Sequence, residues 1–166
     1  IAIGQGTQIL IGHQIGARKY EEAYTRGLKS LRLGILISFI CALVFSIFSK
    51  PLLSIFTSNE NILALGSILI WMTIILEPGR AFNIVIINSL RGTGDVKFPV
   101  IVGIISMWGV AVALSYILGI HFGLGLIGVW IAFIADEWIR GILMLRRWKS
   151  KVWMKKNFIY DKENIA

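Results

Sequence analysis

Long segments without charged side chains restrict this chain more than any other feature of its sequence. Residues 33–49 and 98–119 contain no charged side chain, and residues 62–90 contain only Glu77 and Arg80. A helix needs about 20 mostly apolar residues to cross roughly 30 Å of hydrocarbon. The composition agrees, because 56% of the residues are hydrophobic and 16% are charged, whereas soluble domains are typically about 25% charged. We therefore expect a polytopic all-α membrane protein.

Five segments are expected to form a transmembrane helical bundle within residues 1–147. They lie at about residues 1–16, 33–49, 62–90, 98–119 and 123–145. The first is too short to span a membrane alone, and the charged residues 18–32 after it are interpreted as an amphipathic surface helix or a loop. Pro78 lacks a backbone N–H and predicts a kink in the third segment. Residues 148–166 are expected to form a basic cytoplasmic tail.

Basic residues gather on alternate connections between these segments. If the five spans run antiparallel, 14 of the 17 Lys and Arg residues lie on one side of the membrane, and the other side holds Lys50, with His121 as a second candidate. The 14 residues are Arg18, Lys19, Arg26, Lys29, Arg32, Arg91, Lys97, Arg146, Arg147, Lys149, Lys151, Lys155, Lys156 and Lys162. The positive-inside rule places them in the cytoplasm. We therefore expect a multi-pass protein of the plasma membrane with a cytoplasmic C-terminus, whose net charge of +8 suits the lipid bilayer rather than nucleic acid.

The third segment carries polar side chains within apolar sequence. A charged side chain near the bilayer centre costs a few kcal/mol, so Glu77 and Arg80 should face the protein interior, a partner or water. At 100° per residue they share a helix face with Asn88, and Asn83 lies next to Arg80. Two interpretations stay open: a salt bridge that only holds helices together, or a titratable or cation-binding site in a transport cavity. The neighbouring arginine competes with a bound cation for the carboxylate, which counts against a simple cation site.

Polar side chains also occur in the first and fifth segments. Gln5 and Gln8 are three residues apart and share a face, where they would either hydrogen-bond to another helix or line a polar cavity. Asp136 and Arg140 are spaced i, i+4 with the acid first, the favourable order for an intrahelical pair. We interpret them as a structural pair close to the cytoplasmic interface.

The sequence contains no pattern that indicates an enzyme. It has no Ser-His-Asp or Cys-His arrangement with suitable spacing, no cluster of metal-ligand residues, and a single cysteine, Cys41, inside an apolar segment. The glycine-rich stretches 91–95 and 123–128 lack the preceding strand or the Lys-Ser/Thr pair of a nucleotide loop. We expect neither catalysis nor an organic cofactor or metal.

Three stretches resemble the multidrug and toxic compound extrusion (MATE) transporters, and they occur in the same order. They are GQGTQILIGHQIGARKYEEA at residues 4–23, LRGTGDVKFP at residues 90–99 and GLGLIGVWIAFIADEWIRGILMLRRWKSKVW at residues 123–153. The second resembles the loop between the tenth and eleventh helices of those transporters. The third resembles their last helix and its basic exit. Together the stretches extend the resemblance over most of the chain.

The resemblance implies the C-terminal part of a twelve-helix, two-lobe exporter, with the N-terminal lobe of the same chain missing. The abrupt start without Met agrees with that expectation. Members exchange Na+ or H+ for small organic, often cationic, substrates without ATP, which implies a cation/drug antiporter for multidrug efflux. Acids and polar residues within the lobes of members bind the coupling ion, and Glu77 resembles an acid that some members carry at about this point of their tenth helix. The expected ion and substrate pathway comprises Glu77, Arg80, Asn83, Asn88, Gln5 and Gln8.

Two other functions stay open. A lipid-linked oligosaccharide flippase of the same superfamily would be expected to line its cavity with more basic residues than Arg80. A structural membrane subunit without transport would use Glu77 only for stability, so replacing it with Gln would leave any drug resistance unchanged.

Overall fold

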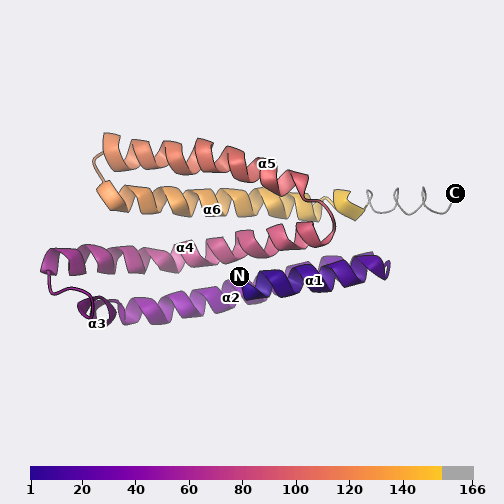
Figure 1. Ribbon diagram of the computed structural model, residues 1–166, viewed down its shortest axis with the longest axis horizontal. Helices are drawn as coiled ribbons and strands as arrows, with labels where there is room; N and C mark the ends of the chain where they lie inside the picture. Colours follow the sequence, from indigo (N-terminus) through magenta and orange to yellow (C-terminus); the bar gives the residue numbers. More distant parts are fainter. Residues whose placement is uncertain (155–166) are drawn as a thin grey trace.

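Helices make up all the regular secondary structure in residues 1–154, the part of the chain that the computed structural model describes (Figure 1). In chain order they are α1 (Ala2–Gly16), α2 (Tyr20–Ile47), α3 (Ser49–Ser54), α4 (Glu60–Gly92), α5 (Lys97–Ser106), the π-helical segments η1 (Met107–Val112) and η2 (Ser115–His121), and α6 (Gly125–Lys149). The expected all-α fold is confirmed.

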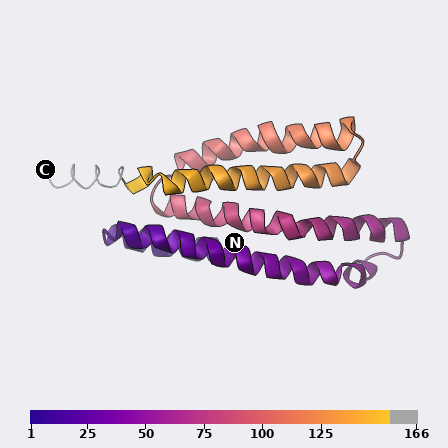
Figure 2. The same cartoon turned by 180° about the vertical axis from the view of Figure 1, so that it is seen from behind.

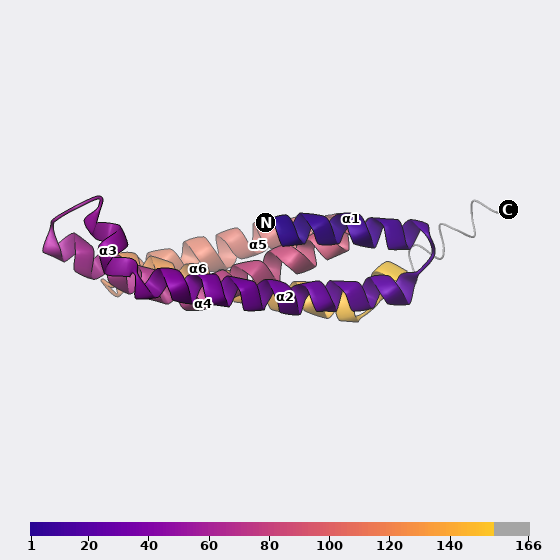
Figure 3. The same cartoon turned by 90° about the horizontal axis from the view of Figure 1, so that it is seen from below.

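The central helix of the bundle is α4. It packs against α1 and α2 on one side and against α6 on the other, while α5 and its π-helical continuation run along α6 (Figures 1 and 2). Seen from below, α1 folds back antiparallel to α2 after a short turn, and α3 lies at the opposite end of α2 (Figure 3). Residues of α4 therefore meet the two halves of the bundle on opposite faces.

Three helices in the described part of the chain are long and apolar enough to cross a membrane. They are α2, α4 and the continuous helical stretch Lys97–His121, with mean hydropathies of 2.2, 1.8 and 2.2. The segments expected at residues 1–16 and 123–145 also form helices, but α1 has only 15 residues. The 25-residue α6 carries three charged side chains near its middle, Asp136, Glu137 and Arg140, so its apolar character is interrupted.

The charged residues 18–32 are not a separate loop. Only a short turn around Arg18 separates α1 from α2, and the rest of the stretch forms the first turns of α2, continuous with the apolar span. The 28 residues of α2 would extend about 42 Å at 1.5 Å per residue, which exceeds the roughly 30 Å of bilayer hydrocarbon. The exposed Arg26, Lys29 and Arg32 thus occupy the part of the helix that the hydrocarbon does not need to cover.

The helix α4 begins at a side-chain cap and stays helical on both sides of Pro78. At its start, Asn59 Oδ1 accepts hydrogen bonds from the backbone N–H groups of Asn61 and Ile62 at 3.0 and 3.3 Å, as expected for a cap residue. One turn before Pro78, the carbonyl of Ile75 accepts a hydrogen bond of 3.1 Å from the Trp138 indole of α6. The carbonyl that loses its helical donor to Pro78 is that of Ile74, four residues earlier. The bond to Ile75 therefore joins α6 to α4 beside the proline and does not replace the lost one.

The start of the expected cytoplasmic tail belongs to the packed core. Trp148 and Trp153 are fully buried, and their rings stack with centroids 4.6 Å apart. Gly27 of α2 leaves room for Trp148, since a Cβ at residue 27 would lie 2.6 Å from that ring. Burial of large aromatic area explains why the segment packs against the bundle rather than leaving it at residue 148. The remainder of the expected tail, residues 155–166, lies outside the described residues.

Candidate functional site

A connected set of charged side chains joins α4 to α6. On α4, Arg80 Nη1 donates to Glu77 Oε1 at 2.6 Å. The Nε atom of the same guanidinium lies 3.8 Å from Glu137 Oε1 on α6. Asp136 and Arg140 of α6 complete the set. We call its five members the charged cluster: Glu77, Arg80, Asp136, Glu137 and Arg140.

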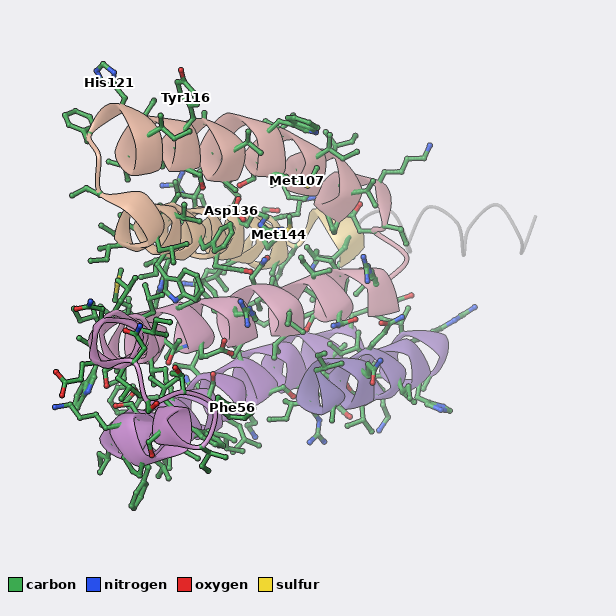
Figure 4. All side chains as sticks on the ribbon, turned by 60° about the vertical axis from the view of Figure 1, so that its left-hand side comes forward. Phe56, Met107, Tyr116, His121, Asp136 and Met144 are labelled. Atoms are coloured by element: carbon green, nitrogen blue, oxygen red, sulfur yellow. The ribbon has the colours of Figure 1, made fainter. Side chains whose placement is uncertain are left out.

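The α6 part of the charged cluster faces the bundle interior. Arg140 Nη2 lies 3.5 Å from Glu137 Oε1 and donates a hydrogen bond to Asp136. Asp136 also accepts a hydrogen bond from the Ser106 hydroxyl of α5, and its side chain is only 6% exposed. Figure 4 labels Asp136 among the packed helices, whereas Tyr116 and His121 point outward from η2. The spacing of Asp136 and Arg140 thus produces the intrahelical contact that their i, i+4 separation favours.

Asn83 connects the two helices at the charged cluster. It is almost completely buried, and its Nδ2 donates to Glu137 Oε2 at 2.8 Å. Its Oδ1 atom has no hydrogen-bond partner among the described residues. The amide therefore fixes one oxygen of the Glu137 carboxylate and leaves the other facing the two arginines.

Two glycines set how closely α4 and α6 approach each other. A Cβ at Gly79 would lie 2.6 Å from the Trp138 Nε1, and a Cβ at Gly141 would lie 2.6 Å from the Phe82 ring. Small residues allow membrane helices to pack backbone against side chain in this way. On α4 the two contacts flank Arg80, at Gly79 and Phe82, and on α6 they follow directly after Glu137, at Trp138 and Gly141. They therefore hold the Glu137 carboxylate opposite Arg80 and Asn83.

The other side of Glu77 and Arg80 opens onto a groove of about 330 Å³ between α1, α2 and α4. The remaining residues of this groove are apolar or small, including Ile3, Gly34 and Ile84. Glu77 also lines an adjacent groove of about 400 Å³ with Phe45 and Thr73. The side chains of Glu77 and Arg80 are 36% and 44% exposed. Arg80 reaches Glu137 of α6 as well as Glu77, whereas the ion-pair partner of Glu77 is Arg80 in its own helix.

The other residues of the expected pathway lie away from the charged cluster. Asn88 Nδ2 donates to the carbonyl of Ile84 in its own helix at 2.9 Å. The Gln8 backbone packs against Gly92, three turns beyond Arg80 on α4, and Gln5 is exposed. Within residues 1–154, none of Asn88, Gln5 and Gln8 forms a hydrogen bond with the charged cluster.

Sequence reasoning omitted two residues of this site. Glu137 follows Asp136 directly and precedes Arg140 by three residues, a spacing that places it on the arginine's side of a helix. That signal was available, but it could not show that Glu137 also faces Arg80. Ser106 lies within an apolar segment, and no local pattern distinguishes it from a serine that faces lipid.

Comparisons with known proteins agree with this architecture. The profile of the MatE family matches residues 1–117. The chain is 56% identical over 155 residues to the uncharacterized transporter YisQ of Bacillus subtilis, covering 93% of this chain and 34% of that protein. It is 30% identical over 124 residues to the probable multidrug resistance protein NorM of Thermotoga maritima, covering 75% of this chain and 27% of that protein. A probable NorM of Neisseria meningitidis is 26% identical over 145 residues, covering 87% of this chain and 31% of that protein. The chain therefore spans about a third of the length of the curated relatives it matches.

Proposed function

The chain belongs to the MatE family of multi-pass membrane transporters, and from this premise we propose that it forms part of a secondary active antiporter. The exchange moves a small organic, cationic substrate out of the cell against the entry of Na+ or H+. It uses the ion gradient in place of ATP. The proposal extends the printed description of the NorM relatives, which are named as probable multidrug resistance proteins, to this chain.

The observation that carries this proposal is the charge balance of the charged cluster. Its three carboxylates and two guanidinium groups leave one negative charge without a basic partner within the cluster. Uncompensated charge is costly among membrane helices and typically marks an ion route. One monovalent cation, either a proton or Na+, would bring the cluster to neutrality.

Within this proposal Glu77 is the residue that binds the coupling ion. It is the member of the charged cluster that reaches both grooves, so an ion or an organic cation can approach it without crossing packed side chains. The apolar walls of the grooves suit the hydrocarbon part of an organic cation, and a carboxylate suits its charge. Competition between substrate and coupling ion for one carboxylate is the simplest basis for exchange.

The proposed orientation places the C-terminal end of α6 in the cytoplasm of a cell bounded by the plasma membrane. The α1–α2 turn, the α4–α5 turn and the C-terminal end of α6 lie at the same end of the bundle (Figure 1). These are the connections that carry the excess of Lys and Arg. The arrangement therefore supports the orientation inferred from the positive-inside rule.

A structural role without transport is the second candidate. It is favoured by the 2.6 Å contact between Glu77 and Arg80, which could serve stability alone. A lipid-linked oligosaccharide flippase is less well supported, because within residues 1–154 Arg80 is the only basic residue that lines the groove of about 330 Å³.

The two candidates differ in the expected effect of Glu77→Gln. The measurement is ethidium efflux from vesicles that contain the full-length protein, with Na+ and pH gradients imposed separately. For an antiporter, we expect the wild type to respond to one gradient and Glu77→Gln to lose that response while remaining at normal levels in the membrane. Full gradient-driven efflux by Glu77→Gln would contradict the assignment of Glu77, and lower protein stability with unchanged efflux would favour the structural role.

A further inference from the structure

Arg80 is shared between two carboxylates on different helices. Its Nη1 donates to Glu77 at 2.6 Å, and its Nε lies 3.8 Å from Glu137. A guanidinium is a planar group with five donors in a fixed fork. A small rotation of the side chain would therefore strengthen one contact at the expense of the other. Arg80 is therefore within reach of both acids, but it forms a close hydrogen bond only with Glu77.

The two acids differ in access and in orientation. Glu77 is 36% exposed and lines the groove, whereas Glu137 is 15% exposed and is held by Asn83. The Asn83 amide occupies Oε2 of Glu137, which leaves Oε1 directed at the arginines. A cation that enters through the groove therefore meets Glu77, while Glu137 is oriented to receive a guanidinium.

Arg140 does not remove the need for Arg80 at Glu137. Its Nη2 donates to Asp136 and lies farther from Glu137, at 3.5 Å. Asp136 is the most buried acid of the charged cluster, so it requires this partner most strongly. Glu137 is thus the acid of α6 that remains available to a second arginine.

Arg80 competes with a bound cation for the Glu77 carboxylate, which by itself would disfavour cation binding there. A second acceptor for Arg80 would remove this competition. A cation bound at Glu77 repels Arg80, and a displaced guanidinium without a partner is costly between membrane helices. We propose that Glu137 takes over the Arg80 guanidinium when Glu77 binds the coupling cation, and so acts as a positioning residue for ion exchange. The proposal rests on the proposed function, in which Glu77 binds that ion.

The exchange of partners would also change how the helices are joined. The pair between Arg80 and Glu77 lies within α4, whereas a pair between Arg80 and Glu137 links α4 to α6. Occupancy of the groove by a cation would thereby strengthen the contact between these two helices. A ligand shifts a conformational equilibrium by its differential affinity for the two states, and the new interhelical pair supplies that difference.

The test is a double-mutant cycle in the full-length protein reconstituted into vesicles. Ethidium efflux is measured over a series of Na+ concentrations and, separately, of pH values, for wild type, Glu137→Gln, Arg80→Gln and the double variant. We expect Glu137→Gln to raise the cation concentration for half-maximal efflux by about tenfold, equivalent to about 1.4 kcal/mol, because Arg80 then has no second acceptor. Maximal efflux should be largely retained. Glu60→Gln, at the exposed start of α4, is the matched control and should resemble the wild type.

The Arg80→Gln background separates the proposed exchange from a general structural effect. Without the guanidinium there is nothing to transfer, so adding Glu137→Gln should not weaken the cation dependence further. An equal effect of Glu137→Gln with and without Arg80 would overturn the inference, as would an unchanged half-maximal concentration in the single variant. If Glu137→Gln does not accumulate in the membrane, Glu137→Ser, which also lacks the carboxylate, replaces it, and a wild-type half-maximal concentration in that variant overturns the inference equally.

The outcomes distinguish this inference from the proposed function. Absence of any cation-driven efflux in the wild type, or full coupling in Glu77→Gln, would remove both. Coupled efflux in the wild type and its loss in Glu77→Gln, together with an unaltered Glu137→Gln, would remove only the role of Glu137.

Discussion

Asn83 holds Glu137 through one hydrogen bond of 2.8 Å across the α4–α6 contact. The acceptor is a carboxylate, and hydrogen bonds to charged groups are stronger than those between neutral ones. Asn83 is also almost completely buried, so its amide orients the Glu137 carboxylate from within the contact between the two helices.

At the residue scale we expect Asn83→Leu to destabilise the protein by about 1–2 kcal/mol. The leucine has a similar size but cannot donate to Glu137, whose carboxylate then lacks one of its partners. The measurement is the thermal unfolding of the full-length protein in detergent, with the fraction that stays folded at each temperature determined by size-exclusion chromatography. Asn61→Leu, at an exposed position of the same helix, is the control and should change the melting temperature much less. Equal melting temperatures for Asn83→Leu and wild type would contradict the assigned contact.

At the scale of elements, the contact between α6 and η2 depends on Gly128, which has no side chain. A Cβ at Gly128 would lie 2.6 Å from the Leu118 carbonyl carbon and 2.7 Å from the Gly119 backbone nitrogen. Backbone atoms cannot move aside as a flexible side chain can. The apolar pattern did not predict the π-helical segments η1 and η2, because hydropathy does not distinguish α from π hydrogen bonding. The close approach of Gly128 to the backbone of η2 could therefore be recognised only in the folded structure.

We expect Gly128→Ala to separate α6 from η2 and to cost about 1–3 kcal/mol, as overpacking in a close contact typically does. Gly103→Ala is the matched control, since a Cβ at residue 103 meets no atom within 4 Å. There the substitution should be neutral or slightly stabilising, because alanine favours the helix over glycine. Thermal unfolding in detergent measures both variants. A melting temperature of Gly128→Ala at or above that of Gly103→Ala would show that the contact does not form.

At the scale of the whole molecule, ion pairs and aromatic contacts join the C-terminal end of α6 to the other helices. Arg147 Nε lies 2.7 Å from Asp95 in the α4–α5 turn, and Lys151 Nζ lies 2.6 Å from Glu21 at the start of α2. Lys151 also sits 4.6 Å from the Tyr24 ring centroid. This end of the bundle therefore combines the excess of basic residues with contacts that connect three parts of the chain.

The orientation of the bundle can be tested by labelling from outside the cell. In a full-length version whose cysteines, including Cys41, are replaced by serine, we expect Ser58→Cys to react with a membrane-impermeant maleimide in intact cells. Ser150→Cys, at the basic end, should react only after the cells are permeabilised. Both positions are exposed in the structure, so burial does not explain a difference between them. The reverse pattern would show that the basic end faces outward.

Composition and local sequence patterns were enough to predict the class of the fold and much of its local structure. Long, mostly apolar segments predicted the helices, and the i, i+4 spacing of Asp136 and Arg140 predicted their contact. The pairing of charges between helices, in contrast, became visible only in the folded bundle. Glu137 lies 57 residues from Arg80 in the chain, and their approach depends on the depth at which Gly79 and Gly141 seat Trp138 and Phe82. Local patterns report hydrophobicity and helix period, whereas pairing across a helix interface depends on register and close packing, which no short stretch of sequence contains.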